Sequence, residues 1–303
     1  MNAFDLPLRV ARLLFAGGPA RYDVRGKTVL ITGAGDGIGR ALARELHQRG
    51  AAVAILDVRA AAATAAAAEL PGALGLAVDV RDRAAMARAV SQVAAHFGRL
   101  DVVVANAGIT PPPATIRTID PDAFDRVIDV NLTGAFNTVH PALDHVIANR
   151  GHVVVVASCA AFSPGMGGAA YMVSKSGAEQ LGRALRLELA PHGATATTAY
   201  FGVVETQLAR TTLDEDPLGR ELDAMLPAPL RRRITAEQAA RTIADGIARR
   251  TARTIAPAAW QAYALTRGIA DIVLDRYLAE DSDLHRLLTE LERRTTSPDP
   301  SRG

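Results

Sequence analysis

Tyr171 and Lys175 are the residues whose types and spacing point most directly to chemistry. They are four positions apart, so on a helix both side chains lie on one face, one turn from each other. A tyrosine with its ordinary pKa of about 10 is a poor base at neutral pH, but a neighbouring ammonium group favours the phenolate and lowers that pKa. The pair could therefore exchange a proton with a carbonyl/alcohol couple. Ser158, thirteen residues before the tyrosine, could hold the reacting oxygen from the other side.

The lysine content of the chain gives this pair more weight than chance spacing would. A Tyr-x-x-x-Lys pair occurs in many helices without any function. Of the 34 Lys and Arg residues here, however, only Lys27 and Lys175 are lysines. Lysine is a compact point charge, whereas arginine is a planar fork that does not deprotonate. A lysine at position 175 therefore indicates a chemical requirement.

A glycine-rich turn near the start of the chain predicts a phosphate cradle. Residues 28–31 form a short, β-branched apolar run, typical of a buried parallel strand. Residues 32–39 have the pattern T-G-x-x-x-G-x-G and lead into a helical pattern that reaches Gly50. The glycines of the turn are Gly33, Gly37 and Gly39. Glycines let the backbone approach a pyrophosphate, and a helix N-terminus offers free N–H groups and a positive dipole end.

Asp57 ends the next predicted strand, residues 52–57, and lies 18 residues after Gly39. At that position a carboxylate can accept hydrogen bonds from the ribose hydroxyls of adenosine, and it would repel a 2′-phosphate. Asp36, inside the turn, adds a second negative charge. Together they favour NAD over NADP. Two alternatives stay open: Asp57 could cap the next helix, and Arg59 could receive a phosphate.

The rest of the chain alternates between strand and helix patterns. Further strands are expected at residues 74–78, 101–105, 152–157, 195–200 and 254–256, and helices at 83–97, 122–148, 171–190 and 236–250. This alternation predicts an α/β fold, a single Rossmann-type domain over residues 28–257 with a doubly wound parallel sheet. Ligands of such sheets bind beyond the carboxyl ends of the strands. The glycine-rich turn, Asp57, Asp79, Asn106 and Ser158 all fall at such ends.

Two extensions flank this domain. Residues 1–27 form an amphipathic N-terminal extension with Phe4, Leu8 and Leu13 on one side and two basic residues, Arg9 and Arg12. Residues 258–303 form a C-terminal extension, helical by its period to about residue 293 and ending in a polar tail expected to be disordered.

The C-terminal extension carries two apolar stripes, which must be buried somewhere. They are Leu265, Ile269, Ile272 and Val273, and then Leu284, Leu287, Leu288 and Leu291. The candidate sites are the rim of the protein's own cleft, a subunit interface and a membrane surface. The acidic residues of this stretch, such as Asp271 and Asp275, would be repelled by anionic lipid, so the N-terminal extension is the better membrane candidate. We expect the C-terminal helices to pack against the body or a partner subunit.

Composition sets broad limits. A chain of 303 residues with 49% hydrophobic and 22% charged residues is ordinary for a globular protein, and its net charge of +2 gives no indication of nucleic-acid binding. The single cysteine, Cys159, fits a reducing compartment, so we expect a cytoplasmic protein without a secretory signal. No apolar run reaches the ~18 residues needed to span a bilayer. The histidines show no metal-ligand spacing.

Between residues 25 and 257 the sequence resembles the short-chain dehydrogenases/reductases. Its glycine-rich turn is similar to the coenzyme loop of that family, Asp79-Val80 to its adenine contact, and Asn106-Ala107-Gly108 to its strand-four signature. The resemblance implies a catalytic tetrad of Asn131, Ser158, Tyr171 and Lys175. It implies coenzyme binding by Gly33, Asp36, Gly37, Ile38, Gly39, Asp57, Asp79, Val80, Asn106, Ala107, Gly108, Tyr171, Lys175, Val204 and Thr206.

In that family the tyrosine exchanges the proton, and the lysine binds the nicotinamide ribose and tunes the tyrosine. The serine orients the substrate oxygen, and the asparagine anchors a water that relays protons. One departure concerns the nicotinamide loop, where Phe201-Gly202 stands in place of the usual Pro-Gly. Losing the proline removes a fixed φ from that loop.

We expect an NAD-dependent alcohol dehydrogenase or ketone reductase that acts on a lipophilic secondary alcohol or ketone, such as a steroid, terpenoid or long-chain compound, and forms a homodimer or homotetramer. The substrate loop, residues 203–235, is mostly apolar through Leu208, Leu213, Leu218, Leu222, Met225, Leu226 and Leu230. Phe162, Met166 and residues 111–113 are expected to face the same cleft. The alternatives are an NADPH-dependent carbonyl or 3-oxoacyl reductase and, from another class, a non-catalytic nucleotide-binding or sensor protein.

Overall fold

A computed structural model describes residues 21–296. Residues 1–20, which hold most of the predicted N-terminal amphipathic extension, and the tail residues 297–303 lie outside the described part. Within residues 21–296, no helix combines the length and the apolar character that crossing a membrane requires.

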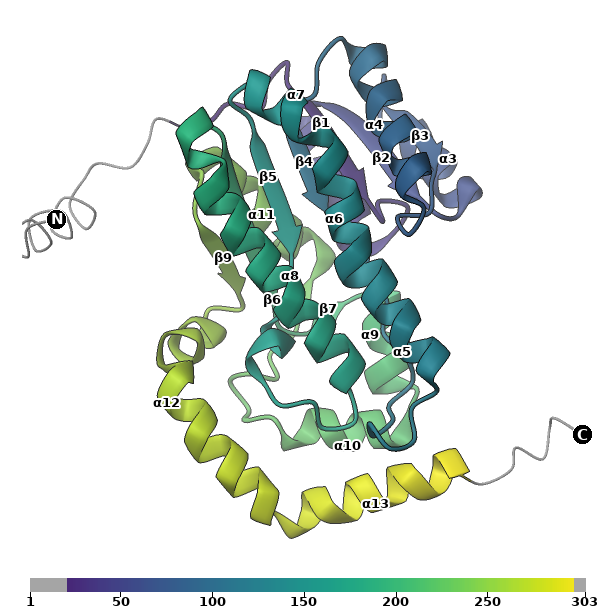
Figure 1. The fold of residues 1–303 in the computed structure, drawn as a ribbon, viewed down its shortest axis with the longest axis vertical. Coiled ribbons are helices and arrows are strands. Elements are labelled where there is room, and N and C mark those ends of the chain that lie inside the picture. The colour runs from purple at the N-terminus through teal and green to yellow at the C-terminus, as the bar shows by residue number, and fades with distance from the viewer. Residues whose placement is uncertain (1–20, 297–303) are drawn as a thin grey trace, which may run out of the picture.

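Seven parallel strands form one twisted sheet (Figure 1) in the order β3-β2-β1-β4-β5-β6-β9. The strands are β1 (Thr28–Thr32), β2 (Ala52–Asp57), β3 (Leu74–Ala77), β4 (Val102–Ala105), β5 (His152–Val156), β6 (Thr195–Phe201) and β9 (Arg253–Ala256). The predicted doubly wound parallel sheet is therefore confirmed. The strand order reverses between β1 and β4, and sheets of this kind bind their ligands beyond that point.

Helices cover both faces of the sheet. One face carries α2 (Gly37–Gln48), α3 (Ala60–Ala68) and α11 (Ala236–Arg249); the other carries α4 (Arg83–Phe97), α6 (Gly134–Val139), α7 (Leu143–Ala148) and α8 (Ala169–Glu188). Successive side chains of a strand point to opposite faces. Val29 and Ile31 accordingly belong to one core and Leu30, between them, to the other. Burial on both faces explains why the strands are continuous apolar runs.

The sequence patterns gave no bounds for helix α3, the helix that follows Asp57. Eight of its nine residues are alanines, so it has no contrast between an apolar and a polar face. Ala63 and Ala66 are nonetheless buried against the sheet. A Cβ at Gly75 in β3 would lie 2.8 Å from the carbonyl oxygen of Ala63. Small residues on both sides therefore let this helix approach its strand closely.

The helical stretch predicted over residues 122–148 is present, but it is not a uniform α-helix. The structure has α5 (Pro121–Ile128), a π-helical turn (Asp129–Thr133), α6, a 3₁₀ turn (His140–Ala142) and α7. Pro141 lies in the 3₁₀ turn, where it cannot donate a backbone hydrogen bond. The π-helical turn contains Asn131, and such turns often mark functional sites.

The C-terminal extension forms two helices, α12 (Ala259–Glu280) and α13 (Ser282–Thr296), which run around the lower edge of the molecule in Figure 1. The stripe on α13 is buried: Leu287 and Leu291 pack against Leu218 of α10 (Pro217–Met225). The stripe on α12 is not. Its four predicted members are each at least 65% exposed, so this stripe does not pack against the body of the described chain, and its burial against a partner subunit stays a prediction.

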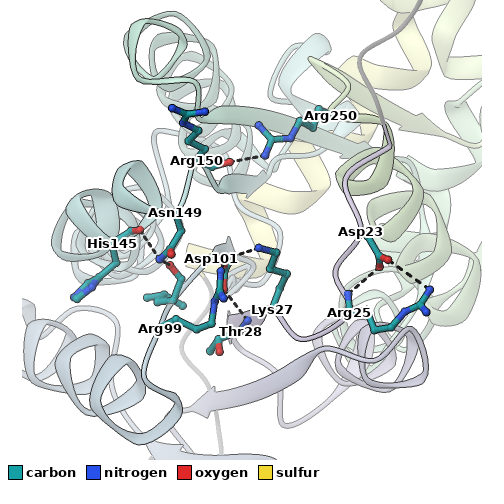
Figure 2. Close-up of polar contacts among 11 residues, drawn as sticks. Asp23, Arg25, Lys27, Thr28, Arg99, Asp101, His145, Asn149, Arg150 and Arg250 are labelled. Carbon is teal, nitrogen blue, oxygen red and sulfur yellow. Dashed lines mark hydrogen bonds and ion pairs between the residues drawn. The ribbon is translucent and has the colours of Figure 1, made fainter.

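Asp101 joins the amino ends of two neighbouring strands, at the edge of the sheet opposite the ligand side (Figure 2). This fully buried carboxylate accepts a hydrogen bond from the backbone N–H of Thr28 at 3.0 Å and pairs with Arg99 at 2.6 Å. Lys27 completes the cluster, with its Nζ 3.5 Å from Asp101 and over the ring of Tyr22. One of the two lysines of the chain therefore has a structural role.

Replacing Asp101 by Ala should lower the free energy of unfolding by about 2–3 kcal/mol, because the buried N–H of Thr28 loses its acceptor and two cations lose their partner. Asp23→Ala is the matched control, since the Asp23–Arg25 pair is largely exposed and such pairs contribute at most about 1 kcal/mol. Urea unfolding of both variants measures the difference. Equal losses would contradict the role assigned to Asp101.

Candidate active site

A cleft of about 1110 Å³ lies beyond the carboxyl ends of the strands. Its floor is made by the glycine-rich turn and the ends of β2, β4 and β5. Its roof is the substrate loop, which contains α9 (Gln207–Ala209), a π-helical turn (Arg210–Asp214) and α10. Three residues of the expected tetrad, Ser158, Tyr171 and Lys175, line this cleft. The fourth, Asn131, lies behind the wall of the cleft, where it binds the backbone of Ile109.

The glycine-rich turn has room for a ligand because its side chains are missing. A Cβ at Gly39 would lie 2.5 Å from the carbonyl oxygen of Gly33, and one at Gly33 would lie 2.8 Å from the Cα of Ala107. Gly33 also has a φ of +62°, in the left-handed region that favours glycine. Helix α2 then begins at Gly37 with its N-terminus at the cleft. This cradle fits the pyrophosphate of a dinucleotide.

Two neighbours hold the turn in this shape. The Asn106 side chain donates to the carbonyl oxygens of Thr32 at 2.9 Å and Gly33 at 3.2 Å, which ties the end of β4 to the end of β1. Asp36 caps α2 by accepting from the N–H of Gly37 at 2.7 Å. Ala107, Gly108 and Ile38 complete this part of the wall.

Asp57 is buried at the end of β2, where its Oδ2 accepts from the backbone N–H of Gly35 at 3.0 Å. Its Oδ1 accepts from the backbone N–H of Arg59 at 3.0 Å and lies 3.3 Å from the Arg59 guanidinium. Helix α3 starts after Arg59 without a side-chain cap, so Asp57 does not cap it. Asp57, which favours NAD, and Arg59, which favours NADP, are therefore ion-paired with each other.

Asp79 and Val80 follow β3 and line the same end of the cleft. The Asp79 carboxylate pairs with Arg81 at 2.7 Å, and the hydrogen bond from Arg81 lowers the Asp79 pKa. Val80 is buried against Gly134, where a Cβ would lie 2.6 Å from a Val80 methyl. The α6 helix can thus approach the predicted adenine site because residue 134 has no side chain.

Ser158, Tyr171 and Lys175 come together from two elements. Ser158 follows β5, and its Oγ donates to the carbonyl oxygen of Phe201 at 3.3 Å. A hydrogen bond joins the side chains of Ser158 and Tyr171. One turn along α8, the Lys175 Nζ lies 5.7 Å from the centre of the Tyr171 ring and donates to the carbonyl oxygen of Val156 at 3.0 Å.

Burial governs the protonation of this cluster. It raises the Tyr171 pKa, and the hydrogen bond to Ser158 offsets part of that rise. It lowers the Lys175 pKa to about 8. The pKa of Tyr171 is thus raised, whereas the Tyr–Lys pair alone was expected to lower it, because the loss of solvent outweighs the effect of the neighbouring charge. At neutral pH the coenzyme-free chain therefore holds a neutral phenol beside an ammonium group.

Asn131 braces the cluster from behind. Its Oδ1 accepts from the N–H of Ile109 at 2.8 Å, and its Nδ2 donates to the Ile109 carbonyl oxygen and to Ser174 Oγ, both at 2.9 Å. Ser174 in turn donates to the carbonyl oxygen of Tyr171 at 2.7 Å. The side-chain amide of Asn131 is thus used to connect the loop after β4 with α8. The expected water relay stays a prediction.

The nicotinamide loop keeps its place without the usual proline. Phe201 is the last residue of β6, pairs with Ala256 of β9 and is buried. The next N–H, of Gly202, donates to the Ala256 carbonyl oxygen at 3.0 Å. Strand pairing therefore fixes this backbone where a proline ring would restrict it. Val204 and Thr206 follow and line the cleft.

The roof of the cleft is apolar, as the sequence predicted, although not every predicted residue faces it. Leu208, Leu213, Leu222, Leu226 and Met166 line the cleft. The other apolar residues of the loop, Leu218, Met225 and Leu230, pack against the C-terminal extension instead. Phe162 was expected at the cleft, which is wrong: it is buried against Tyr200, with ring centres 5.0 Å apart. Pro111 and Pro113 line the cleft, whereas Pro112 does not.

Three contributors were missed from the sequence. Ser174 and Ile109 carry the hydrogen bonds of Asn131, and Trp260 of the C-terminal extension reaches the cleft wall. Ser174 lies three residues after Tyr171, a spacing that places it on the neighbouring face of the helix. That spacing was the one available signal. Nothing in the pattern marked Ile109, because its backbone atoms do the binding.

Comparison with known proteins identifies the family. The short chain dehydrogenase model matches residues 27–217. The chain is 32% identical over 216 residues to 2-dehydro-3-deoxy-L-rhamnonate dehydrogenase (NAD(+)) of Sphingomonas sp. (strain SKA58), covering 68% of this chain and 85% of that one. It is 35% identical over 206 residues to cis-4-hydroxycyclohexanecarboxylate dehydrogenase of Sinomonas cyclohexanicum, covering 64% and 83%.

Among solved structures, the 3-ketoacyl-(acyl-carrier-protein) reductase of Brucella melitensis complexed with NADH superposes with a TM-score of 0.67 and 27% sequence identity. The superposition covers 77% of this chain and 97% of that one.

The two lysines should respond in opposite ways to replacement by Met. Burial lowers the Lys175 pKa to about 8 in the folded chain, against about 10.4 when unfolded. Below pH 8 this burial costs roughly 3 kcal/mol, more than the ~1 kcal/mol of its hydrogen bond, so Lys175→Met should raise the Tm at pH 7. Wild-type stability gains from this lysine as pH rises from 8 to 10.5, because the unfolded chain then binds the extra proton.

The gain of Lys175→Met should therefore shrink towards pH 10. Lys27→Met is the control, because it removes a partner of buried Asp101 and should lower the Tm at pH 7. Thermal unfolding at pH 7 and pH 10 measures both variants. A lower Tm for Lys175→Met at pH 7 would contradict the assignment of an energetically costly charge.

Proposed function

Because the chain belongs to the short-chain dehydrogenase family, we propose that it is an NAD-dependent oxidoreductase that interconverts a lipophilic secondary alcohol and its ketone. The observation that carries this proposal is the cluster of Ser158, Tyr171 and Lys175 at the cleft that also contains the glycine cradle. A protein that only bound a nucleotide would need the cradle but not a tyrosine hydroxyl hydrogen-bonded to a serine at the cleft.

The chain's own residues provide the proton chemistry. Bound coenzyme would supply the nicotinamide ring that accepts or donates the hydride. Ser158 holds the substrate oxygen next to the Tyr171 hydroxyl. In ketone reduction Tyr171 donates its proton to that oxygen, and in alcohol oxidation its phenolate accepts the hydroxyl proton. Lys175 favours the phenolate electrostatically and presents its ammonium group to the ribose of the coenzyme.

The raised pKa of Tyr171 predicts how the rates of reduction and oxidation depend on pH. A neutral phenol is the form that reduction needs, so reduction should proceed at neutral pH and below. Oxidation needs the phenolate, whose fraction grows as pH rises. The kcat/KM for oxidation should therefore increase towards alkaline pH.

Tyr171→Phe should lower kcat by at least about 100-fold in both directions, since a general acid–base group contributes about 10²–10⁴ in rate. Coenzyme affinity, measured by NADH fluorescence, should change little because the cradle is untouched. Tyr277→Phe, at an exposed tyrosine of α12, is the matched control and should keep full activity. A Tyr171→Phe enzyme that retains a tenth of the wild-type kcat would exclude Tyr171 as the proton donor.

The preference for NAD rests on Asp57. This carboxylate is held by Gly35 of the cradle itself, so it cannot swing away from an adenosine ribose without disturbing the turn. A 2′-phosphate would meet its negative charge, while the two ribose hydroxyls of NAD can donate to it. The relative from Sphingomonas is named as an NAD(+) enzyme, and the Brucella structure contains NADH. Arg59, 60% exposed but paired with Asp57, is the observation that favours the NADPH alternative.

Wild type should use NAD with a kcat/KM at least tenfold above that for NADP, a difference of about 1.4 kcal/mol. Asp57→Asn removes the repulsion and releases Arg59, so it should narrow or invert this ratio. In the double variant Asp57→Asn/Arg59→Ala, the gain with NADP should be lost. Steady-state rates with both coenzymes give the ratios. A wild type that prefers NADP would reject the proposal and support the NADPH-dependent reductase.

The proposed substrate class is inferred from the residues of the substrate loop that form the roof of the cleft. Leu208, Leu213 and Leu222, together with Met166 and Leu226, line the same cleft as Tyr171. By their names, relatives act on a polar rhamnonate derivative and on the hydrocarbon-rich cis-2,3-dihydrobiphenyl-2,3-diol, so membership of the family does not determine whether the substrate is polar or apolar. An apolar roof favours substrates that bury hydrocarbon. A 3-oxoacyl chain would satisfy the same surface.

Across 2-alkanones of increasing length, kcat/KM should rise roughly fourfold per CH₂ until the cleft is full, since each buried CH₂ contributes about 0.8 kcal/mol. Leu222→Asp should flatten this dependence, and Leu187→Asp, at an exposed position of α8 away from the cleft, should not. Best activity on a sugar or a small polyol would contradict the lipophilic class.

A further inference from the structure

Trp260, the only tryptophan of the chain, connects the C-terminal extension to the nicotinamide loop, residues 201–206. It is the second residue of α12, is 4% exposed and lines the cleft. A Cβ at Gly202 of this loop would lie 2.6 Å from Nε1 of the indole and 3.1 Å from its Cδ1. The five-membered ring of the indole therefore packs directly against the backbone of the loop.

This contact requires that residue 202 has no side chain. The φ of Gly202 lies outside the left-handed region, so its backbone conformation does not by itself require glycine. The space that a Cβ would need is instead filled by Trp260 and by the ring of Pro257, whose Cδ would lie 3.2 Å from it. Two residues that follow β9 thus determine how the loop passes Gly202.

The indole is held in one orientation by its other contacts. Its N–H donates to the carbonyl oxygen of Leu230, near the end of the substrate loop, at 3.1 Å. Its ring meets the ring of Tyr263 edge to face, with the ring centres 5.8 Å apart. The Tyr263 hydroxyl in turn lies 3.2 Å from the carbonyl oxygen of Phe162, in the turn after Ser158. A buried side chain that is anchored in this way can support the loop that packs against it.

Gly202 needs such a support because it lies between two paired segments. Before it, Phe201 pairs with Ala256, and the N–H of Gly202 donates to the Ala256 carbonyl oxygen at 3.0 Å. After it, a short parallel pair joins β7 (Val204–Glu205) to β8 (Ile234–Thr235). Glycine has the freest backbone of all residues, and a proline at position 201 would restrict the chain just before it. In this chain the indole restricts the loop by contact instead.

We propose that Trp260 is a positioning residue of the coenzyme site, which holds the nicotinamide loop in the shape that binds the coenzyme. This inference rests on the proposed function, because it requires that the cleft binds NAD(H). The glycine cradle and Asp57 belong to β1, α2 and β2, whereas Trp260 follows β9, the edge strand of the other half of the sheet. Replacing Trp260 should therefore weaken binding of the nicotinamide half of the coenzyme and not of the adenosine half.

Two ligands separate these halves. NADH carries the nicotinamide ring, whereas ADP-ribose carries the adenosine, the pyrophosphate and the second ribose without it. In isothermal titration calorimetry, Trp260→Ala should raise the Kd for NADH at least about fivefold, as expected if the released loop adopts the competent shape about one-fifth of the time. Its Kd for ADP-ribose should stay within about twofold of the wild-type value, because the cradle that binds the pyrophosphate is unchanged.

Hydrogen exchange tests the loop without any ligand. The amides of residues 203–206 should exchange faster in Trp260→Ala than in wild type, because the unsupported loop opens more often. Leu189→Ala is the matched control, since it also empties a buried position but lies at the end of α8 that leads into the amino end of β6. It should change neither the exchange of residues 203–206 nor the ratio of the Kd values for ADP-ribose and NADH.

Trp260→Phe keeps the proposal testable if the alanine variant does not fold. A phenyl ring fills less of the space beside Gly202 and cannot donate to Leu230, so this variant should shift the ratio of the two Kd values in the same direction by a smaller factor. A ratio equal to that of wild type in the folded Trp260 variants would overturn the proposal, even if both ligands bind more weakly. A wild type that binds neither ligand would overturn the proposed function, and this inference with it.

Discussion

The close approach of the first turn to the end of β4 is the constraint on which the rest of the site depends. Backbone atoms of Gly33, Gly39 and Ala107 occupy space in which a single added methyl group would collide. This contact brings Asn106 within reach of the turn and leaves the start of α2 facing open space. The space for a ligand thus exists because Gly33 and Gly39 have no side chains, and the polar groups around that space are held by the same backbone contact.

The energetically least favourable group of the site, the buried ammonium of Lys175, lies on α8. Lys175 is buried, its ammonium group donates to the carbonyl oxygen of Val156, and burial disfavours its charged form. Ser174, one residue earlier, ties the same helix to Asn131 in the π-helical turn. Because α8 is held at both Ser174 and Lys175, the energetically unfavourable ammonium group of Lys175 stays in place. Such locally unfavourable arrangements persist at functional sites when the surrounding structure fixes them. The stability for this comes from elsewhere, including the Asp101 cluster at the far edge of the sheet.

Much of the fold follows from local patterns, and the exceptions have physical reasons. The strands were predictable because β-branched runs bounded by glycine and acid have a clear period. The bounds and the buried face of helix α3 were not, because a run of alanines has no period. The π-helical turn at Asn131 was not, because a shifted backbone hydrogen bond leaves no mark in composition. Side-chain pairing such as Asp57–Arg59 depends on rotamers that spacing does not determine. The two stripes of the C-terminal extension have similar periods, yet α13 is covered and α12 is exposed, because burial depends on what the chain places opposite.

The attachment of α13 to the roof has a consequence for how this enzyme could be redesigned. Leu287 and Leu291 form one small core with Leu218, and Arg294 pairs with Asp216 at the start of α10 at 2.8 Å. The roof is therefore half of a module whose other half lies some seventy residues later in the chain. Grafting a substrate loop from a relative that lacks this extension would leave α13 without its support. Exchange of specificity in this chain requires residues 203–235 and 282–296 to be transplanted together.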